Sequence, residues 1–458
     1  MSVKDSKKIL SNITWGEGIT EQGKGELGDA ATEAKNLSED NVADFAKEVA
    51  KYLQNSVKSV EDEGVYTISG LKAGYYLVKD KDNTLTNKDD FYTAYIMEVV
   101  GNVEANPKGK KPTLDKQIKH NESNKWGVVG DNQIGDTVEF RTITSVPDTK
   151  GYDTYSYIIQ DTMSAGLTSN VKINTDVIIK VNNEDDKVLE SQYYTVAQDG
   201  TNLNKFSITV DIINAVKDGK MKAGESLYSY YTGVLNKNAL IYDAGKQDNT
   251  AYLEYSNNPN NTADKGKTPD KKVYDWTFKM DVNKVDNKSA SLTGAKFVLS
   301  KKGNLGELSE SDVDSKANDL ISLIANNGEY TVAPANTQET TTKVIEAGST
   351  TIKGLDDNTD YYLYEIKAPT HYNKLKAPVK FNIAAEYNAA GAGLLEGKPT
   401  VTIDNGRPNT NLVANVVNES GSTLPSTGGI GTTIFYVVGA ILMVGAAILL
   451  ITKKRAEN

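Results

Sequence analysis

The chain has 458 residues, a formal net charge of −10 and no cysteine, and its length corresponds to about three domains of common size. Without cysteine it has no disulfide bonds and no thiol chemistry. Acidic and basic residues are interspersed, so the chain lacks the basic patch that nucleic-acid binding needs. Tyrosine (25) far outnumbers phenylalanine (8), and this composition favours many β-strands joined by polar turns.

The first region, residues 1–105, combines one expected helix with a few strands. It begins MSVKDSKKIL, without the apolar run of a secretion signal, so we expect a missing signal peptide and a first domain truncated at its start. Ser38 is suited to cap a helix. Apolar residues at 3–4 spacing would form one face of that helix: Val42, Phe45, Ala46, Val49 and Leu53.

A linker follows at residues 106–112, which read Asn-Pro-Lys-Gly-Lys-Lys-Pro. Two prolines, a glycine and three lysines are typical of an exposed segment between domains. We therefore expect the amines of Lys108, Lys110 and Lys111 to be accessible to solvent.

Residues 113–270 read as short strands throughout. Residues 271–420 begin with a long expected strand over 273–285 and contain one expected helix near 312–325. Short strands with frequent turn signals predict a mainly β protein built from tandem Ig-like β-sandwiches.

Strand alternation places a lysine on an apolar face in each of these two regions. The residues that share a face are Phe278, Met280, Val282 and Lys284 in one strand, and Leu114, Lys116 and Ile118 in the other. A lone buried ammonium group is costly and loses its proton. The alternative is a lysine near a strand end whose amine reaches water.

An acid and an asparagine fall on the inward faces of the same regions. Glu365 and Asn418 accompany Lys284, and Asp161 and Asn257 accompany Lys116. Burial would give a neutral nucleophilic amine and a neutral carboxylic acid. The amine would then attack the carboxamide, release ammonia and leave an isopeptide bond between the first and last strands, in a single turnover driven by proximity.

The C-terminus contains a short motif, an apolar run and a basic tail. The motif consists of Leu424, Pro425, Ser426, Thr427 and Gly428. The uncharged run over 430–451 matches a hydrocarbon core of about 30 Å at about 1.5 Å per residue. The basic tail at 453–455 would stay cytoplasmic. We expect a transmembrane helix, and the alternative is an ordinary tail anchor with a chance pentapeptide.

These features resemble the major backbone pilins of Gram-positive sortase-assembled pili. The pentapeptide resembles the LPxTG sorting signal, and Tyr-Leu-Tyr-Glu-Ile-Lys-Ala-Pro at 362–369 resembles the pilin E-box. Residues 284–297 resemble the start of a Cna B-type domain, and 161–163 with 255–259 resemble the middle pilin domain. The resemblance is good after the linker and weak before it.

The resemblance implies a domain plan of tandem Ig-like or Cna-type β-sandwiches followed by a transmembrane sorting helix. The expected parts are an N-terminal pilin domain at 1–105, a linker at 106–112, a middle isopeptide-forming sandwich at 113–270, a Cna B-type sandwich at 271–420 and a sorting signal at 421–458.

The resemblance also assigns roles to the inward residues. It implies one bond from Lys116 to Asn257 assisted by Asp161, and a second bond from Lys284 to Asn418 assisted by Glu365. These assignments name the same residues that strand alternation selects.

Sortase would cleave after Thr427 and transfer its acyl group to a lysine of another subunit. Lys108 is the expected acceptor because it keeps the Pro-Lys pair of the pilin motif. The aromatic residue and the final asparagine of that motif are absent, so Lys110 and Lys111 remain alternatives.

The expected function is therefore a structural pilus shaft subunit, anchored to the cell wall after transient membrane insertion. The expected partners are sortase, identical subunits, ancillary pilins and peptidoglycan, and nucleic acid is excluded. A wall-anchored or pilus-tip adhesin that binds host surface molecules is the alternative. No enzyme, cofactor or metal is expected. The two histidines, His120 and His371, lie far apart without a partner pattern, and the acidic loop at 80–90 fails the EF-hand spacing.

Overall fold

The computed structural model describes residues 2–4, 9–39, 41–81, 84, 92–104, 111–261, 263–421 and 430–456. The chain divides into two compact units. The first contains residues 1–276 and 387–393, and the second contains residues 277–386 and 394–458.

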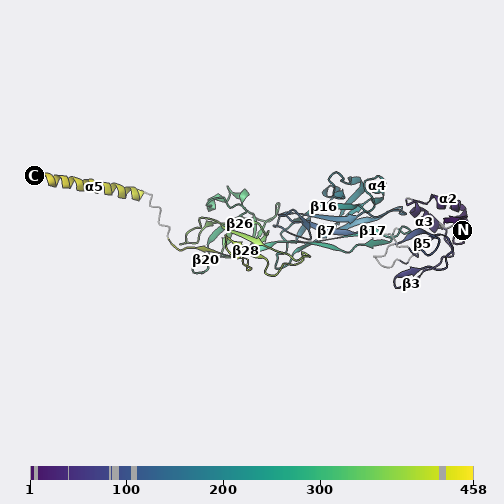
Figure 1. The fold of residues 1–458 in the computed structure, drawn as a ribbon. Coiled ribbons are helices and arrows are strands. Elements are labelled where there is room, and N and C mark those ends of the chain that lie inside the picture. Colours follow the sequence, from purple (N-terminus) through teal and green to yellow (C-terminus); the bar gives the residue numbers. More distant parts are fainter. Residues whose placement is uncertain are drawn as a thin grey trace. The chain divides into compact units, whose positions relative to one another are not determined.

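Three short helices lie in the N-terminal part of the first unit (Figure 1): α1 (Glu21–Glu26), α2 (Ala30–Asn36) and α3 (Val42–Ala50). The expected helix is confirmed, but Asn41 rather than Ser38 is the residue before its first turn. The apolar face of α3 is buried as expected, because Val49 packs with Ile19 and Leu27 in a small core.

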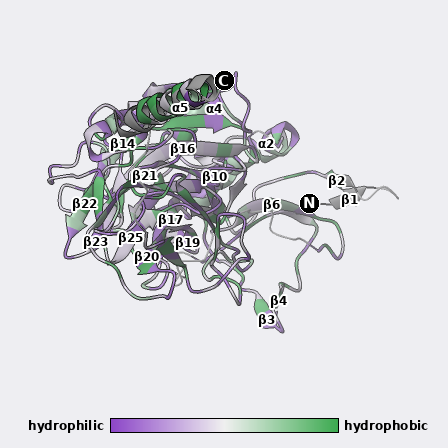
Figure 2. Ribbon diagram, turned by 90° about the vertical axis from the view of Figure 1, so that its left-hand side faces the viewer, coloured by the Kyte–Doolittle hydropathy of each residue, from purple (hydrophilic) through white to green (hydrophobic). Residues whose placement is uncertain are grey.

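The described strands before the linker pair only two at a time. They are β1 (Ser2–Lys4) with β2 (Ile9–Ser11), β3 (Val60–Asp62) with β4 (Val65–Thr67), and β5 (Gly74–Lys79) with β6 (Ala94–Val99). Figure 2 colours part of the β3–β4 hairpin as hydrophobic. Its apolar side chains lie in solvent, with Val60 72% and Tyr66 71% exposed. The described residues of this region therefore do not form a β-sandwich of their own.

The rest of the first unit is a sandwich of two sheets. One sheet contains β7 (Leu114–Lys119), β8 (Trp126–Gly127), β10 (Thr137–Ser145), β12 (Leu167–Ser169), β13 (Ile178–Val181) and β16 (Ser226–Leu235). The other contains β9 (Val129–Asp131), β11 (Tyr157–Met163), β14 (Tyr194–Gln198), β15 (Lys205–Val210), β17 (Gln247–Ser256), β18 (Lys265–Lys267) and β19 (Lys271–Trp276). Three short helices connect strands: η1 (Asn174–Asp176), η2 (Ser191–Tyr193) and α4 (Ile212–Lys217).

Strict alternation of buried residues explains why these strands form a sandwich. Every second residue of β16 and of β17 is buried, as a strand with one face on a core requires. Phe140 and Ile118 of one sheet and Phe206 of the other are almost fully buried. Each such side chain contributes about 1.5–3 kcal/mol when removed from water.

The second unit is a sandwich of two five-stranded sheets. One contains β20 (Phe278–Asp286), β22 (Leu323–Asn326), β23 (Glu329–Val332), β25 (Ser349–Leu355) and β29 (Val413–Asn418). The other contains β21 (Ala295–Ser300), β24 (Val344–Ala347), β26 (Asp360–Lys367), β27 (Val379–Ala384) and β28 (Thr400–Ile403). The expected mainly β class with sandwich domains is confirmed.

Two local expectations in this unit are wrong. The helix expected near 312–325 is replaced by the single turns η3 (Glu310–Asp312) and η4 (Ala317–Asp319), after which the chain enters β22. The long strand expected over 273–285 is broken at Thr277, whose hydroxyl donates to the Leu355 carbonyl at 3.0 Å. The residues before the break join a sheet of the first unit, and those after it join a sheet of the second.

The C-terminal helix α5 spans Ile430–Ala456, so the helical conformation expected there is confirmed. Among the helices in the described part of the chain, none is both long enough and apolar enough to cross a membrane. The expected transmembrane helix over 430–451 is therefore not supported. Residues 424–428 of the pentapeptide lie outside the described residues.

Candidate functional site

The inward-facing lysine of the middle region lies in β7. Leu114, Lys116 and Ile118 are buried on one face of this strand, and the residues between them are more exposed. Lys116 is only 1% exposed, so its amine does not reach water.

The Lys116 amine meets an acid and a phenol inside the sandwich. Its Nζ donates a hydrogen bond to Oδ2 of Asp161 at 2.6 Å and another to the hydroxyl oxygen of Tyr231. The Tyr231 hydroxyl in turn donates to the same oxygen of Asp161. Because Asp161 lies in β11 and the other two residues lie in β7 and β16, this cluster joins the two sheets.

Burial determines the protonation of this cluster. It lowers the pKa of Lys116 although Asp161 opposes the shift, and it raises the pKa of Asp161 against the opposing effects of Lys116, Tyr231 and Asn249. The amine also lies 5.0 Å from the ring centre of Tyr231 and 5.5 Å from that of Phe140. Removing both charges from water favours a neutral amine beside a neutral acid.

The structure does not bring Asn257 to Lys116. Asp161 pairs with Ala251 in the register of β11 and β17, and Asn257 lies six residues further along the chain. At about 3.4 Å per residue, this separation is about 20 Å. Asn257 instead accepts a hydrogen bond at its main-chain oxygen from the amide of Tyr92 at 2.8 Å. The expected pairing with Lys116 is therefore corrected by the strand register.

A different asparagine, Asn249, occupies the place expected of Asn257. It lies two residues before Ala251 in β17, so it shares the inward face, and it is fully buried. Its side chain lies close enough to act on the pKa of both Asp161 and Tyr231, although neither of its polar atoms makes a well-formed hydrogen bond within the described residues. Strand alternation makes Asn249 as good a candidate as Asn257, because both asparagines follow the same alternation, and only the strand register separates them.

The second site joins β20, β29 and β26. Strands β20 and β29 run parallel, with Lys284 opposite Val416, so Asn418 is the next residue on the same face. Nδ2 of Asn418 donates to Oε2 of Glu365 at 2.9 Å across the sandwich. Lys284, Glu365 and Asn418 are all 3% exposed or less. The structure thus brings these three expected residues together.

Main-chain groups hold the amine and the acid of this second site. Nζ of Lys284 donates to the carbonyl oxygens of Val416 at 2.8 Å and Val285 at 3.2 Å. Burial lowers the pKa of Lys284 to about 8, against the opposing effect of Glu365. Burial also raises the pKa of Glu365, opposed first by the hydrogen bond from Asn418 and then by that from the Leu375 amide at 2.7 Å.

The expected acceptor residues are only partly described. Lys108 and Lys110 lie outside the described residues, and Lys111 is exposed. Of the acidic loop, Asp80 accepts a hydrogen bond from the Thr93 amide at 2.7 Å, so its carboxylate organises the neighbouring strand. Nε2 of His120 lies 3.3 Å from Oδ2 of Asp131.

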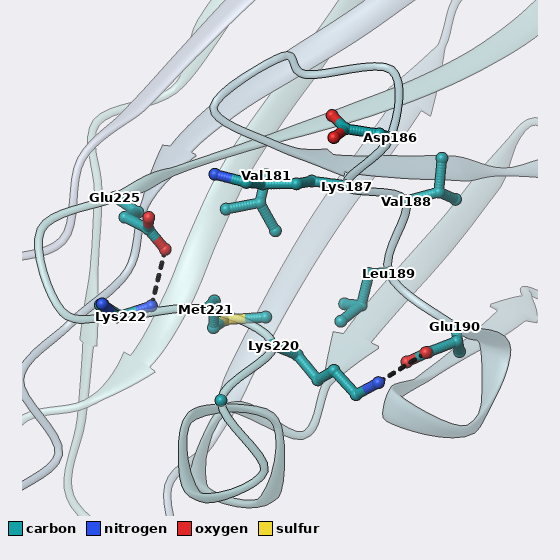
Figure 3. Close-up of a pocket in the computed structure, with 11 residues that line it drawn as sticks. Val181, Asp186, Lys187, Val188, Leu189, Glu190, Lys220, Met221, Lys222 and Glu225 are labelled. Atoms are coloured by element: carbon teal, nitrogen blue, oxygen red, sulfur yellow. Dashed lines mark hydrogen bonds and ion pairs between the residues drawn. The ribbon is translucent and has the colours of Figure 1, made fainter.

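A surface hollow of about 410 Å³ in the first unit is separate from both lysine clusters. Figure 3 shows two interactions among its lining residues: Lys220 pairs with Glu190 at 2.7 Å, and Glu225 accepts a hydrogen bond from the main-chain amide of Lys222 at 2.7 Å. Val188 and Leu189 line its apolar part.

Comparison with known families identifies two segments of the chain. Residues 278–391 match the SpaA family, described as a prealbumin-like fold domain, and residues 416–458 match the LPXTG cell wall anchor motif. The first match contains Lys284 and Glu365, and the second contains Asn418 and the pentapeptide.

One curated relative is the trypsin-resistant surface T6 protein of Streptococcus pyogenes serotype M6. It is 24% identical over 363 residues, which are 70% of this chain and 65% of the relative. This chain therefore spans just under two thirds of that relative's length.

Among solved structures, the full-length major pilin SpaD of Corynebacterium diphtheriae aligns with a TM-score of 0.47 and 18% identity, covering 82% of this chain and 87% of that one. The T6 backbone pilin of S. pyogenes aligns with a TM-score of 0.44 and 16% identity, covering 83% and 89%. The two family matches give the chain a SpaA prealbumin-like domain and a cell wall anchor motif, so the expected cell-wall-anchored surface localisation is confirmed, as is the resemblance to sortase-assembled Gram-positive backbone pilins.

Proposed function

We propose that this protein is a structural shaft subunit of a covalent pilus and that it crosslinks itself at two internal sites. The observation that carries the proposal is the buried set of Lys284, Glu365 and Asn418. Lys284 and Asn418 lie on β20 and β29, the first and last strands of their domain, and Glu365 lies on β26 of the facing sheet. Such a set has no role in ligand binding at the surface, whereas it suits a subunit that must withstand tension. The domain plan expected from the sequence is part of this proposal, except that residues 271–276 belong to the middle sandwich and not to the last one.

The chemistry at the second site follows from its geometry. A neutral Lys284 amine attacks the side-chain carbonyl carbon of Asn418, and the carbon–nitrogen bond to the amide nitrogen breaks. Glu365, kept neutral by burial, donates a hydrogen bond to the carbonyl oxygen once the amide turns to present it. It then carries one proton from the attacking nitrogen to the departing one, so ammonia leaves and an isopeptide bond remains.

The first site is proposed to react in the same way between Lys116 and Asn249, with Asp161 as the acid. Asn249 replaces Asn257 because it lies next to the acid on the inward face of β17. Bond formation at each site consumes the lysine amine and the asparagine carboxamide once, so the protein acts on itself and turns over no substrate.

Polymerisation is proposed to use the anchor motif and the linker. Sortase would cleave between Thr427 and Gly428, and the Thr427 acyl group would pass to Lys108 of another subunit, with Lys110 and Lys111 as the alternative acceptors. Identical subunits then form the shaft, ancillary pilins attach to it, and transfer to peptidoglycan ends growth.

The T6 relative from Streptococcus pyogenes is named as a trypsin-resistant surface protein. Internal crosslinks would give this chain a similar resistance, because a protease needs locally opened segments and a crosslinked sandwich opens less often.

Intact mass spectrometry tests the crosslinks. Purified full-length chain should weigh less than its sequence by the mass of two ammonia molecules. A deficit of one ammonia molecule would mean that only one of the two sites forms its bond. No deficit would mean that neither internal crosslink forms.

Denaturing gels of wall extracts test the polymer. Wild-type cells should give a ladder of high-mass species that Lys108→Ala abolishes, with Lys172→Ala, at an exposed position of the first unit, as a matched control. A ladder that survives Lys108→Ala would identify Lys110 or Lys111 as the acceptor. If wild-type cells give no ladder, the protein is a monomeric surface protein such as an adhesin, whether or not the internal bonds form.

A further inference from the structure

The two proposed crosslinking sites differ in the groups that the lysine amine contacts. At the second site the amine of Lys284 donates to main-chain carbonyl oxygens. At the first site the amine of Lys116 donates to a side-chain hydroxyl, that of Tyr231, in addition to the acid. Neither composition nor alternation drew attention to this tyrosine.

We propose that Tyr231 is a catalytic residue of the first site that relays a proton from the Lys116 amine to Asp161. This inference rests on the proposed crosslink. The Tyr231 oxygen accepts a hydrogen bond from Nζ of Lys116 and donates one to Oδ2 of Asp161, so it forms a continuous path between them. Because it contacts the attacking nitrogen itself, it can act on the reacting atoms directly.

The proton balance of the reaction requires such a path. When Nζ of Lys116 forms its bond to the Asn249 side-chain carbon, that nitrogen must lose one proton. The Tyr231 oxygen takes this proton and passes its own to Asp161. Asp161 in turn gives a proton to the Asn249 amide nitrogen, which leaves as ammonia with the electron pair of the broken bond. Tyr231 and Asp161 end the reaction unchanged.

The second oxygen of Asp161 is suited to the last transfer. Oδ2 of Asp161 is occupied by Lys116 and Tyr231, whereas Oδ1 makes no hydrogen bond within the described part of the chain. One oxygen can therefore receive the proton while the other remains available to the nearby amide of Asn249.

The ring of Tyr231 is fixed by packing, so the hydroxyl is held in place before the reaction. It stacks on Phe140 with ring centres 6.0 Å apart and meets Phe206 edge-on at 5.1 Å. Burial, with Asp161, raises the pKa of Tyr231 well above its ordinary value. The hydroxyl therefore stays protonated, which a relay requires and a permanent base would not.

The test compares Tyr231→Phe with Tyr157→Phe in the full chain. Tyr157 is also fully buried in the first sandwich, but its hydroxyl donates to the Ser145 carbonyl at 3.0 Å, away from the lysine. Chain is made in a short pulse of cell-free synthesis and sampled over time. Digestion and mass spectrometry then measure two crosslinked peptides, one joining Lys116 to Asn249 and one joining Lys284 to Asn418. The rate at which the second peptide forms is the internal reference in every sample.

Tyr231→Phe should slow formation of the first crosslink about 100-fold, the lower end of the range for proton-transfer catalysis, while the second crosslink forms at the wild-type rate. The remaining slow reaction should speed up as the buffer is made more alkaline, because the proton must then be lost to solvent. Tyr157→Phe should leave both rates unchanged.

Three outcomes would overturn the relay. The first is a Tyr231→Phe chain that crosslinks as fast as wild type, which leaves the crosslink itself intact. The second is equal slowing by Tyr157→Phe or slowing that does not change with pH, since either would indicate a general packing effect. The third is a wild-type chain without the first peptide, which would remove the proposed first crosslink and the relay with it.

Discussion

The two sandwiches each bury a lysine, an acid and an asparagine, but they differ in which of these side chains contacts the acid directly. In the first, Lys116 contacts Asp161 directly and the asparagine lies to one side. In the second, Asn418 contacts Glu365 directly and Lys284 is held by main-chain oxygens. The same three chemical groups thus come from different strand arrangements. The shared requirement is burial that neutralises both amine and acid, not one conserved geometry.

The crosslinks themselves would enclose nearly equal lengths of chain. Lys116 to Asn249 and Lys284 to Asn418 each enclose about 130 residues, and by the loop-closure argument used for disulfides each crosslink stabilises its domain by about 5 kcal/mol. Any difference in stability between the two domains would then come from packing.

The largest expected effect is loss of the second crosslink in Glu365→Ala. Without the acid, no group carries the proton, so the mass deficit should fall by one ammonia. The domain should lose about 5 kcal/mol of stability, measured by thermal or denaturant unfolding. Glu307→Ala, at an exposed position of the same unit, should keep both the mass deficit and the stability. A Glu365→Ala chain that still loses two ammonia molecules would show that the acid is not needed.

Asn249→Ala and Asn257→Ala distinguish the two candidate partners of Lys116. Asn249→Ala should reduce the mass deficit by one ammonia, because it removes the carboxamide next to Asp161. Asn257→Ala should leave the deficit at two, since the register places this residue about 20 Å along the strand. The opposite pattern would mean that the register of β11 and β17 differs from the one described.

The smallest expected effect concerns pH in the uncrosslinked Asn418→Ala chain, where the Lys284 amine remains free. Its pKa is about 8 in the folded state and about 10.4 when unfolded. The unfolded chain therefore binds more protons between these values, so the stability of this domain should rise as pH increases from about 8 to about 10.4.

Two controls isolate this contribution in thermal unfolding. The crosslinked wild type has no free Lys284 amine and should lack this rise, as should a double variant that adds Lys284→Met. The rise in stability with pH is compared between the Asn418→Ala chain and the double variant. If the two chains show the same rise over this window, the Lys284 amine is not desolvated in the fold.

Strand alternation was sufficient to find the two buried lysines, but it did not decide which asparagine is the partner of Lys116. Lys116 and Lys284 were identified because a period of two is a local property of a strand. Asn257 was predicted, although Asn249 satisfies the same period, and only the pairing of β11 with β17 decides between them. Strand register depends on contacts between distant segments, which a single sequence does not contain.

Local signals also failed where tertiary packing overrides them. The segment near 312–325 has helical spacing, but its last residues pair with β23 as a strand and leave only single turns before it. Tyr231 was missed because tyrosine is an ordinary core residue on an inward strand face. Only the hydrogen bonds of its hydroxyl distinguish it from Tyr157.

The parallel pairing of β20 with β29 determines how this domain would respond to mechanical force. A pull on the start of β20 and on the end of β29 loads their hydrogen bonds in shear, so the bonds must fail together rather than one by one. Once Lys284 is joined to Asn418, the force passes from one strand to the other through that bond. The roughly 130 residues between them carry no load, and the fibre would transmit tension without lengthening at this domain.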